Sequence, residues 1–481
     1  MTTQTNYYAI VIGAGAAGLE IAKGLAAAKK RILLIDKVQY GTGCPHFGCI
    51  PSNAFIASSN IAHEIWRSGF FGIDMVMSNF QSNRALQRVR EVVEEARTAC
   101  SPHALQELGI ETYNSECSFV DPHTVQVTSQ DGQKQLISAK FIVIAVGSCP
   151  RIASIKGLEE VPYYTSENIF SLTEIPESLA IVGGGQTGCE LAQAFRRLGT
   201  NVTLVEQKGC LLSAEEPEVH KIMQSCLIKE GVELYLAKAV SRVRQENDKI
   251  IVHIYDKVED KEYQVRVNKL LIAAGRQPNI ESLNLKASGV FYTDTGIASD
   301  DYGRTTQSHI WVIGDVRKDT LFTHAAEDQA RTVLYNMLMP RMLAKKLTKR
   351  EFIPRVTHTD PEIASIGITE EEAIAKYGNS WITTYTVSLR ESDKALCQSD
   401  TDGFVKFVTK RFSSKILGCT LVTPVASEGL SEITLAMREN IPLRKLSHII
   451  HPYPTYSQII QKAAQKWFST VILPRIPNFF K

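Results

Sequence analysis

The sequence predicts an α/β protein with two similar nucleotide-binding units followed by a C-terminal α+β domain. Each unit reads as a buried strand, a glycine-rich turn, a helix and a second strand that ends in an acidic residue. A third stretch, residues 346–481, adds strands and helices after a basic run that resembles a linker. The 481 residues are long enough for about two to four domains.

The first unit lies at the N-terminus. A buried strand over residues 7–12 leads into Gly13-x-Gly15-x-x-Gly18, an Ala-rich helix follows, and the next strand ends at Asp36. Glycines in this pattern let the backbone approach a pyrophosphate at the helix N-terminus, and the Asp36 carboxylate can hold ribose hydroxyls. The first unit is therefore predicted to bind a dinucleotide.

The second unit repeats this pattern in the middle of the chain. A strand over residues 179–182 leads into Gly183-Gly-Gly185-Gln-Thr-Gly188, and the strand after the helix ends at Glu206. Two complete units in one chain imply two different dinucleotides, or one dinucleotide bound twice.

The choice of nicotinamide dinucleotide depends on Glu206. Its carboxylate suits a free ribose 2′-hydroxyl and would repel a 2′-phosphate. The following residues Gln207-Lys208-Gly209 contain no arginine pair to bind a phosphate. NADH is therefore favoured over NADPH, and Lys208 is the residue that could reverse this preference.

Two cysteines with four residues between them, Cys44 and Cys49, follow the first unit. Beside a bound dinucleotide, such a pair suggests a disulfide that exchanges electrons with it. Together with the two units, the pair predicts FAD at the first unit and a nicotinamide dinucleotide at the second. The other eight of the ten cysteines are scattered without metal-ligand spacing, so no metal site is predicted.

Composition excludes several classes of protein. Apolar residues make up 44% and charged residues 22%, as in ordinary globular proteins, and the net charge of +2 gives no nucleic-acid footprint. The first strand begins by residue 7, which leaves no room for a signal peptide, and no apolar run reaches the ~18–20 residues of a membrane span. A cytoplasmic location is expected, where a catalytic disulfide is more common than a structural one.

Further patterns organise the remainder of the chain. Two buried strands end in glycine turns at Gly147 and Gly275, which suggests that the chain leaves the first domain and returns to it. A strand that begins at Ile310 ends in Gly314-Asp315, and Asp315 is a candidate for contact with a flavin ribityl chain. One long helix is expected over residues 84–108, and short antiparallel strands over residues 109–138.

These motifs resemble the flavoprotein (pyridine nucleotide) disulfide reductases, the family of dihydrolipoamide dehydrogenase, glutathione reductase and mercuric reductase. The resemblance covers nearly the whole chain and preserves the order of the family's motifs. Besides the cysteine pair, they are Gly13 to Gly18, Val146-Gly147-Ser148, Gly183 to Glu190, Gly275-Arg276-x-Pro278-Asn279, Gly314-Asp315 and Thr359-Asp-Pro361-Glu-Ile-Ala-Ser-Ile-Gly367.

The resemblance implies two Rossmann-like dinucleotide-binding domains, for FAD and NAD, plus a C-terminal α+β dimerisation domain in an obligate homodimer. The expected FAD domain spans 1–150 and 276–345, the NAD domain 151–275 and the dimerisation domain 346–481. The family also implies that Cys49 is the thiol that faces the flavin and Cys44 the interchange thiol. The implied cofactor contacts are Gly13, Gly15, Gly18, Asp36, Gly147, Gly314 and Asp315 for FAD, and Gly183, Gly185, Gly188, Glu190, Glu206 and Gly275 for NAD.

Three positions depart from the disulfide-reducing members of the family. Asn53 replaces a lysine that pairs with the glutamate matching Glu190, while Tyr453 and Gln458 replace the catalytic histidine and its orienting glutamate. A general acid of that kind contributes about 10²–10⁴ in rate, so fast turnover of lipoamide or glutathione disulfide is not expected. Tyrosine at position 453 resembles mercuric reductase, but paired cysteines near the C-terminus are missing from the sequence.

Two histidines are the nearest candidates for a substitute base. His46 lies between the two cysteines and His451 lies just before Tyr453, although packing or solvent exposure is the commoner role for such histidines.

The sequence thus predicts an FAD enzyme that passes electrons from NADH to the Cys44–Cys49 disulfide and on to a small acceptor near Tyr453 of the partner subunit. A small disulfide, a metal ion and a quinone-like molecule all stay open as acceptors. One alternative is an NADH:quinone-type dehydrogenase at the membrane surface, and another is a redox-sensing flavoprotein without turnover. The apolar, aromatic and basic tail over residues 467–481 packs on the dimer or, as the sharper hypothesis, rests on anionic lipid.

Overall fold

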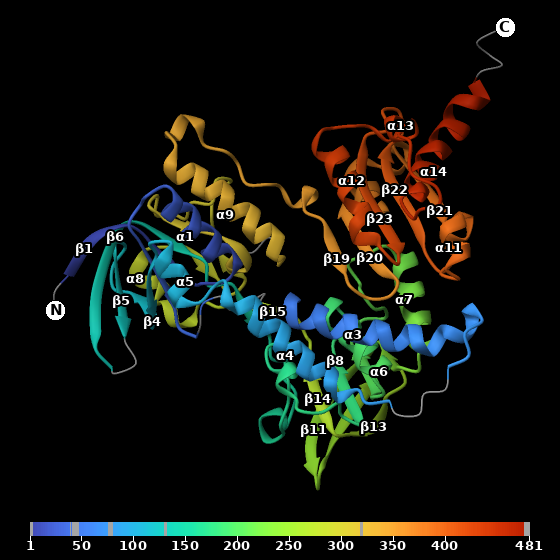
Figure 1. Ribbon diagram of the computed structural model, residues 1–481, viewed down its shortest axis with the longest axis horizontal. Helices are drawn as coiled ribbons and strands as arrows, with labels where there is room; N and C mark the ends of the chain where they lie inside the picture. Colours follow the sequence, from blue (N-terminus) through green and yellow to red (C-terminus); the bar gives the residue numbers. More distant parts are fainter. Residues whose placement is uncertain are drawn as a thin grey trace.

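The computed structural model describes residues 3–38, 40, 48–75, 80–128, 132–317 and 321–475. Its strands form a seven-stranded, a four-stranded and a five-stranded sheet, together with smaller ones. The three larger sheets lie in separate parts of the ribbon, at the left, below the centre and at the upper right of Figure 1. The predicted class, with two nucleotide-binding units and a C-terminal α+β part, is confirmed.

The seven-stranded sheet combines the start of the chain with a segment from much later. Its strands are β1 (Thr3–Ile12), β2 (Ile32–Asp36), β3 (Glu111–Asn114), β4 (Glu116–Phe119), β5 (Thr124–Thr128), β6 (Lys134–Ile144) and β18 (Ile310–Val312). The order is β3-β2-β1-β6-β5-β4, and β18 also pairs with β6. β3, β2, β1, β6 and β18 run parallel, so this part of the sheet directs its carboxyl ends to one edge.

Two helices pack together beside this sheet. Small side chains allow close contact between α1 (Ala16–Ala27) and α9 (Thr323–Leu338). A Cβ atom on Gly24 would lie 2.2 Å from a methyl group of Leu334. The N-terminus of α9 is thereby fixed relative to the first glycine-rich turn.

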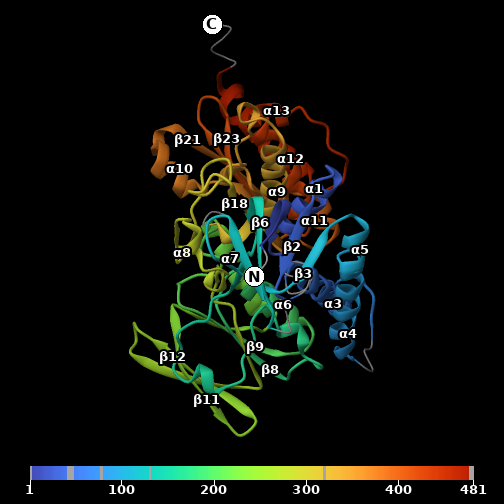
Figure 2. The ribbon, with the colours of Figure 1, turned by 90° about the vertical axis from the view of Figure 1, so that its left-hand side faces the viewer.

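The four-stranded sheet belongs to the second unit and is entirely parallel. Its strands, in the order β10-β9-β8-β14, are β10 (Glu233–Leu236), β9 (Asn201–Glu206), β8 (Ser178–Val182) and β14 (Lys269–Ile272). Helices α6 (Gln186–Arg197) and α7 (Pro217–Lys229) accompany it. A separate antiparallel sheet, near the bottom of Figure 2, comprises β11 (Lys238–Glu246), β12 (Lys249–Asp256) and β13 (Lys261–Val267).

The five-stranded sheet near the C-terminus is entirely antiparallel. Its strands, in the order β19-β20-β23-β22-β21, are β19 (Arg355–Thr357), β20 (Glu362–Gly367), β23 (Ile416–Thr423), β22 (Phe404–Lys410) and β21 (Ile382–Ser388). Its helices include α10 (Glu370–Tyr377), α12 (Ala426–Arg438) and α14 (Gln458–Trp467), and the last two share a buried apolar core with the sheet. The remaining elements are α8 (Leu285–Ser288), α11 (Asp393–Cys397), α13 (Leu443–Leu446), β7 (Ser148–Pro150), β15 (Arg276–Pro278), β16 (Tyr292–Thr293) and β17 (Gly296–Ile297).

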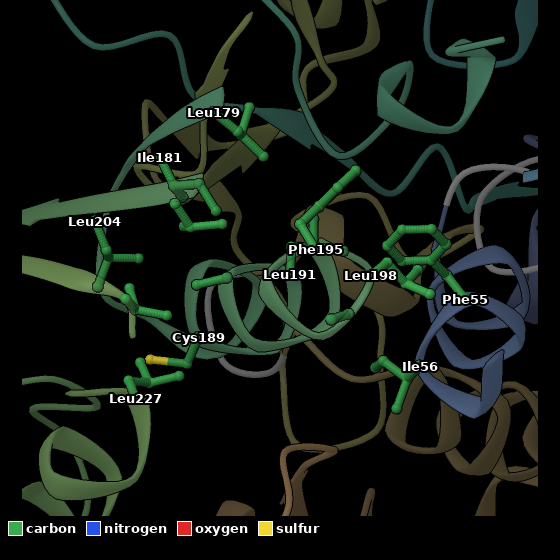
Figure 3. Packing of buried hydrophobic residues seen from close by; sticks show 14 of the residues in the cluster. Phe55, Ile56, Leu179, Ile181, Cys189, Leu191, Phe195, Leu198, Leu204 and Leu227 are labelled. Carbon is green, nitrogen blue, oxygen red and sulfur yellow. The ribbon is translucent and has the colours of Figure 1, made fainter. Parts of the chain in front are cut away.

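The helix that begins at the second cysteine, α3 (Cys49–Arg67), packs on helix α6 of the second unit. Figure 3 shows Phe55 of α3 facing Phe195 of α6 and Leu198, the C-cap of that helix, and the two phenyl rings lie 4.7 Å apart between centroids. Burying aromatic rings of this size stabilises the contact by several kcal/mol in order of magnitude. The contact holds the N-terminus of α3 between the two units.

Buried charges fix the C-terminal sheet to the second unit. The ammonium of Lys406 on β22 is 4% exposed and contacts Glu216, Glu218 and Glu370 at 3.1, 2.9 and 2.8 Å. The Arg197 guanidinium of α6 contacts Asp360 at 3.0 Å, which holds the segment between β19 and β20 against α6. Removing one partner from such a group leaves uncompensated buried charge, so these contacts set the relative position of the two parts.

One predicted helix is wrong. The stretch over residues 84–108 forms two helices, α4 (Asn83–Thr98) and α5 (Pro102–Glu107). The break lies at Ser101-Pro102, where the Ser101 hydroxyl accepts a hydrogen bond from the backbone N–H of Ala104. A serine N-cap followed by proline starts a new helix rather than continuing an old one.

The strands expected over residues 109–138 are antiparallel only in part, because β3 pairs in parallel with β2. Within the residues that the structure describes, no helix is both long and apolar enough to cross a membrane.

Candidate functional site

The first glycine-rich turn leaves room only for hydrogen at two positions. A Cβ on Gly13, whose φ is +102°, would lie 2.4 Å from the carbonyl oxygen of Ala145. A Cβ on Gly18 would lie 1.9 Å from the carbonyl oxygen of Gly13. Gly15 directly precedes α1 as its N-cap, so the free N–H groups of the helix point out of the turn.

Asp36, at the carboxyl end of β2, ties this turn to the loop after the strand. Its two carboxylate oxygens accept hydrogen bonds from the backbone N–H groups of Ala14 at 2.7 Å and Val38 at 2.9 Å. The half-buried carboxylate is therefore held at the edge of the turn, where a ribose would lie.

The second turn has the same construction. A Cβ on Gly183, with φ +117°, would lie 2.4 Å from the Ala273 carbonyl oxygen, and one on Gly188 would lie 1.9 Å from the Gly183 carbonyl oxygen. Gly185 is the N-cap of α6. Both turns thus have the close backbone packing that a bound pyrophosphate requires.

Glu206 takes the place of Asp36 in the second unit. Its carboxylate oxygens accept hydrogen bonds from the backbone N–H groups of Gly184 at 2.6 Å and Lys208 at 2.8 Å. The ammonium of Lys208 donates to the Ser213 hydroxyl at 2.8 Å. The lysine side chain is therefore already engaged beside this carboxylate.

Asp315 lies at the C-terminal end of β18, on the edge expected for a ligand. Its carboxylate accepts a hydrogen bond from the Ser148 hydroxyl at 2.8 Å, and Arg276 in turn donates to that hydroxyl oxygen at 2.7 Å. Burial raises the pKa of Asp315, while the hydrogen bond from Ser148 and the charge of Arg276 oppose the rise. Besides Gly13 and Gly183, positive φ angles occur at three further glycines expected in the cofactor sites, namely Gly147, Gly275 and Gly314.

Of the cysteine motif, Cys49 is described, whereas Cys44 and His46 lie outside the described residues. Cys49 is the first residue of α3, where the helix dipole favours negative charge. Its sulfur lies 3.7 Å from the Thr323 hydroxyl at the start of α9. The Asn53 side chain donates to the Cys49 carbonyl at 2.9 Å, within the first turn of its own helix.

Glu190 of α6 is a half-buried carboxyl group on which the charge of this thiol acts. Its carboxylate accepts a hydrogen bond from the backbone N–H of His358 at 2.7 Å. Burial raises the pKa of Glu190 to about 7; the charge of Cys49 adds to the rise, and the backbone N–H and charge of His358 oppose it. Glu190 is therefore a carboxyl group that can change its charge near neutral pH.

His358 is a site residue that sequence reasoning did not identify. Its ring Nδ1 lies 3.4 Å from a carboxylate oxygen of Glu362, and the other oxygen of that carboxylate accepts from the Ser427 hydroxyl at 2.7 Å. The hydrogen bond to Glu362 is the largest cause of a raised pKa at His358, and the charges of Glu190 and Cys49 add to it. The only signal in the sequence is its place directly before the Thr359-to-Gly367 motif.

The residues expected to replace the acid-base pair lie in the C-terminal part. Tyr453 is 70% exposed, and Gln458 begins α14. His451 is buried, with its ring nitrogens 3.0 Å from the Ile449 carbonyl oxygen and 3.0 Å from a carboxylate oxygen of Glu432. Both nitrogens of His451 are engaged within its own subunit, which is the usual packing role of such a histidine.

No group of three or more potential metal ligands occurs among the residues that the structure describes.

Comparisons with known proteins identify the family to which the chain belongs. Residues 7–330 match the family profile described as pyridine nucleotide-disulphide oxidoreductase, and residues 353–464 match the profile of its dimerisation domain.

Similar proteins cover nearly the entire chain. A mercuric reductase of Streptomyces lividans is 30% identical over 98% of this chain and 98% of its own length. A dihydrolipoyl dehydrogenase of Haloferax volcanii is 30% identical over 95% of each chain. Among solved structures, the Cu(II) complex of the HOCl-induced flavoprotein disulfide reductase RclA from Escherichia coli is 27% identical, covers 96% of this chain and 100% of its own, and superposes with a TM-score of 0.85.

Proposed function

Because this chain belongs to the pyridine nucleotide-disulphide oxidoreductase family, we propose that it is an NADH-dependent reductase whose redox-active pair is Cys44 and Cys49. Membership makes it an FAD-containing, NAD(P)H-dependent oxidoreductase of the disulfide-reductase class. The observation that carries the proposal is the location of Cys49. It starts α3 and contacts Thr323 at the start of α9, and its charge adds to the raised pKa of Glu190 in the second unit.

The residues of the first unit fit FAD. Gly13 and Gly18 form a cradle that a Cβ would fill, and Asp36 and Asp315 offer carboxylates at the same edge of the sheet. Bound FAD supplies the two-electron chemistry that connects a nicotinamide with a disulfide. The chain itself binds the pyrophosphate and ribose, and the dipole of α3 stabilises a thiolate at Cys49.

A reductive titration tests the cysteine assignment. The wild-type protein should take up one electron pair more per chain than Cys44→Ser or Cys49→Ser, because each variant lacks the disulfide. Cys397→Ser, which changes another exposed cysteine, is the matched control and should behave as wild type. Equal electron uptake by the wild type and both serine variants would refute the proposal.

The preference for NADH is supported by Glu206 and Lys208. The carboxylate is fixed by two backbone N–H groups, and the neighbouring ammonium is engaged with Ser213. NADH should bleach the flavin much faster than NADPH does, and Glu206→Arg should reverse the order. A faster reaction of the wild-type protein with NADPH would refute this preference.

The acceptor is proposed to be something other than lipoamide or glutathione disulfide. Tyr453 and Gln458 cannot supply the histidine–glutamate proton transfer, and His451 is already paired with Glu432. Thiophilic metal ions come first in an acceptor panel, because relatives are mercuric reductases and RclA has been solved as a Cu(II) complex. We expect lipoamide turnover about 10²–10⁴ below that of an enzyme with the dyad. Turnover equal to such an enzyme would show that another group supplies the proton.

A homodimer is part of this proposal, since residues 353–464 match a dimerisation domain and the acceptor would lie near Tyr453 of the partner subunit. Sedimentation should give twice the mass of one chain.

Two outcomes of the acceptor panel would support other functions. Quinone reduction that survives Cys44→Ser would support a membrane-surface dehydrogenase. An absence of turnover with any acceptor would support a redox sensor.

Contact of the C-terminal tail with anionic lipid is a further part of the proposal. Residues 476–481 lie outside the described residues, and α14 packs its apolar face on the C-terminal sheet up to Trp467. A truncation after Arg475 therefore spares the core. Liposome binding that disappears in this variant and weakens with salt would support the contact, and equal recovery in the supernatant would leave only packing.

A further inference from the structure

Large apolar side chains lie in solvent at the C-terminal end of α3 and in the short 3-10 helix that follows it. Trp66 is 65% exposed, Phe70 84% and Ile73 57%, and Ile61 and Phe71 are exposed as well. We call these five residues the α3-tip patch. Figure 1 shows this end of α3 projecting at the right, below α11. Single exposed apolar residues are ordinary, but a group gathered in one short stretch marks an interaction surface.

Aromatic contacts hold the patch in a fixed arrangement. The guanidinium of Arg67 lies over the Phe71 ring, 5.3 Å from its centroid. The Trp66 indole packs edge-on against the ring of Phe80, with 6.3 Å between the two centroids. Because these rings are already positioned, a partner that covers them loses little conformational entropy on binding.

The patch adjoins the part of the chain that matches a dimerisation domain, residues 353–464. The Arg67 guanidinium contacts the Asp400 carboxylate at 2.6 Å and donates to the Gln398 carbonyl oxygen at 2.9 Å. Close to these residues in the sequence, Leu396 of α11 is 56% exposed. An interface that begins on the dimerisation domain can therefore extend onto the end of α3 through this junction.

The charge of the patch favours a protein partner over a lipid surface. Over residues 61–75 the charged side chains are one arginine, Arg67, and two acids, Glu64 and Asp74. Attachment to an anionic membrane uses basic side chains beside the aromatic ones, and this arginine is already paired with Asp400. Aromatic side chains with little charge are instead typical of the buried centre of an interface between subunits.

We propose that a second copy of this chain covers the α3-tip patch, so that the dimer interface extends beyond the dimerisation domain onto the end of α3. The second copy is that of the homodimer in the proposed function, on which this inference rests. In a dimer with two-fold symmetry both copies present the same residues, so a single substitution in the patch changes the interface twice. Phe70 is the most exposed of the five residues and is therefore the best position for a test.

Hydroxyl-radical footprinting of the unaltered holoenzyme tests whether the patch is covered. The radicals oxidise accessible aromatic side chains, and peptide mass spectrometry gives the rate at each residue. Phe291, which lies beside β16 and is 60% exposed, is the matched reference for Phe70. In the dimer Phe70 should be oxidised several-fold more slowly than Phe291, although Phe70 is the more exposed residue in a single chain.

A substitution tests whether the covered patch stabilises the dimer. Phe70→Asp would place an unpaired charge in an apolar contact. The dissociation constant of the dimer, measured by sedimentation over a dilution series, should rise by about thirtyfold or more. Phe291→Asp is the matched control and should leave this constant unchanged. If Phe70→Asp does not fold, Phe70→Ser removes the ring without adding charge and should also raise the constant.

The outcomes that contradict the inference are distinct. Rapid oxidation of Phe70 in the dimer, or equal dissociation constants for the Phe70 variants and the wild type, would overturn it and leave the dimer to residues 353–464. Binding to vesicles of mixed zwitterionic and anionic phospholipid that is lost in Phe70→Asp, with an unchanged dimer, would overturn it in favour of a lipid surface. A wild-type protein that sediments as one chain at every concentration would instead overturn the proposed homodimer, and the inference with it.

Discussion

The two glycine-rich turns are alike in local geometry and differ in what surrounds them. In each, the first glycine has a positive φ and lies against a carbonyl from a neighbouring segment, and the third lies against the carbonyl of the first. Beside each turn, the carboxylate of an acidic residue, Asp36 or Glu206, accepts hydrogen bonds from two backbone N–H groups. The local sequence is sufficient to specify this geometry.

The difference lies at the glutamate two positions after the last glycine of each turn. Glu20 of α1 lies 3.7 Å from Arg331 of α9, and the two side chains are 39% and 54% exposed. Glu190 of α6 accepts a hydrogen bond from the backbone N–H of His358, and burial raises its pKa. The same position in the same motif thus forms an ion pair with a neighbouring helix in one unit and contacts the His358 segment, at the proposed redox site, in the other. The elements packed on the helix decide which role it takes.

The largest expected effect comes from adding a methyl group at the last glycine of each turn. In Gly18→Ala and Gly188→Ala the new Cβ would lie 1.9 Å from a backbone oxygen, so the turn must open, at about 3 kcal/mol or more. Gly18→Ala should be purified without flavin absorbance. Gly188→Ala should keep the flavin but lose its reduction by NADH.

A third variant controls for the substitution itself. Nothing lies within 4 Å of a Cβ on Gly69, so Gly69→Ala should change neither flavin content nor melting temperature. Loss of flavin from Gly188→Ala with retention in Gly18→Ala would mean that the two units are assigned the wrong way round.

A smaller effect is expected from the acidic residues. Asp36→Ala and Glu206→Ala each remove two hydrogen bonds from backbone N–H groups, a loss of about 1–2 kcal/mol in the free energy of unfolding. Asp36→Ala should weaken FAD retention during dialysis. Glu206→Ala should raise KM for NADH about tenfold with little change in kcat, because it removes binding shared by the ground and transition states.

Steady-state kinetics with a parallel measurement of flavin content separate these two outcomes. Glu206→Gln, which keeps an acceptor oxygen for Gly184, should lie between Glu206→Ala and the wild type. If Glu206→Ala changes kcat and leaves KM for NADH unaltered, the carboxylate does not bind the ribose.

Features determined by near neighbours could be predicted from the sequence, and those determined by distant ones could not. The glycine turns, Asp36 and Glu206 follow from spacing, because their partners are within about two dozen positions. His358 was missed because it is 168 positions from Glu190, and nothing in its own neighbourhood indicates that contact. The break at Ser101-Pro102 was local and visible in the sequence, so the single long helix was an avoidable error.

The smallest expected effect is a difference between Glu190 and Glu20 in how much each contributes to the pH dependence of the free energy of unfolding. A carboxyl group whose pKa is raised in the folded state binds its proton more tightly there than in the unfolded chain. Wild-type stability should therefore fall as pH rises from about 4.5 to about 7, the ordinary and folded pKa values of Glu190. Glu190→Gln removes this titration and retains an oxygen that can accept a hydrogen bond from the His358 N–H.

Because Glu190 is half-buried, solvent screening limits the difference in the free energy of unfolding to about 1 kcal/mol in favour of Glu190→Gln above pH 7. No difference is expected below about pH 4. Glu20→Gln, which changes only an exposed ion pair, should follow the wild-type curve throughout. Denaturant unfolding midpoints measured across this pH range give the comparison directly. Parallel curves for the wild type and Glu190→Gln would show that the two glutamates are equivalent and that α3 and the His358 segment do not perturb the second unit.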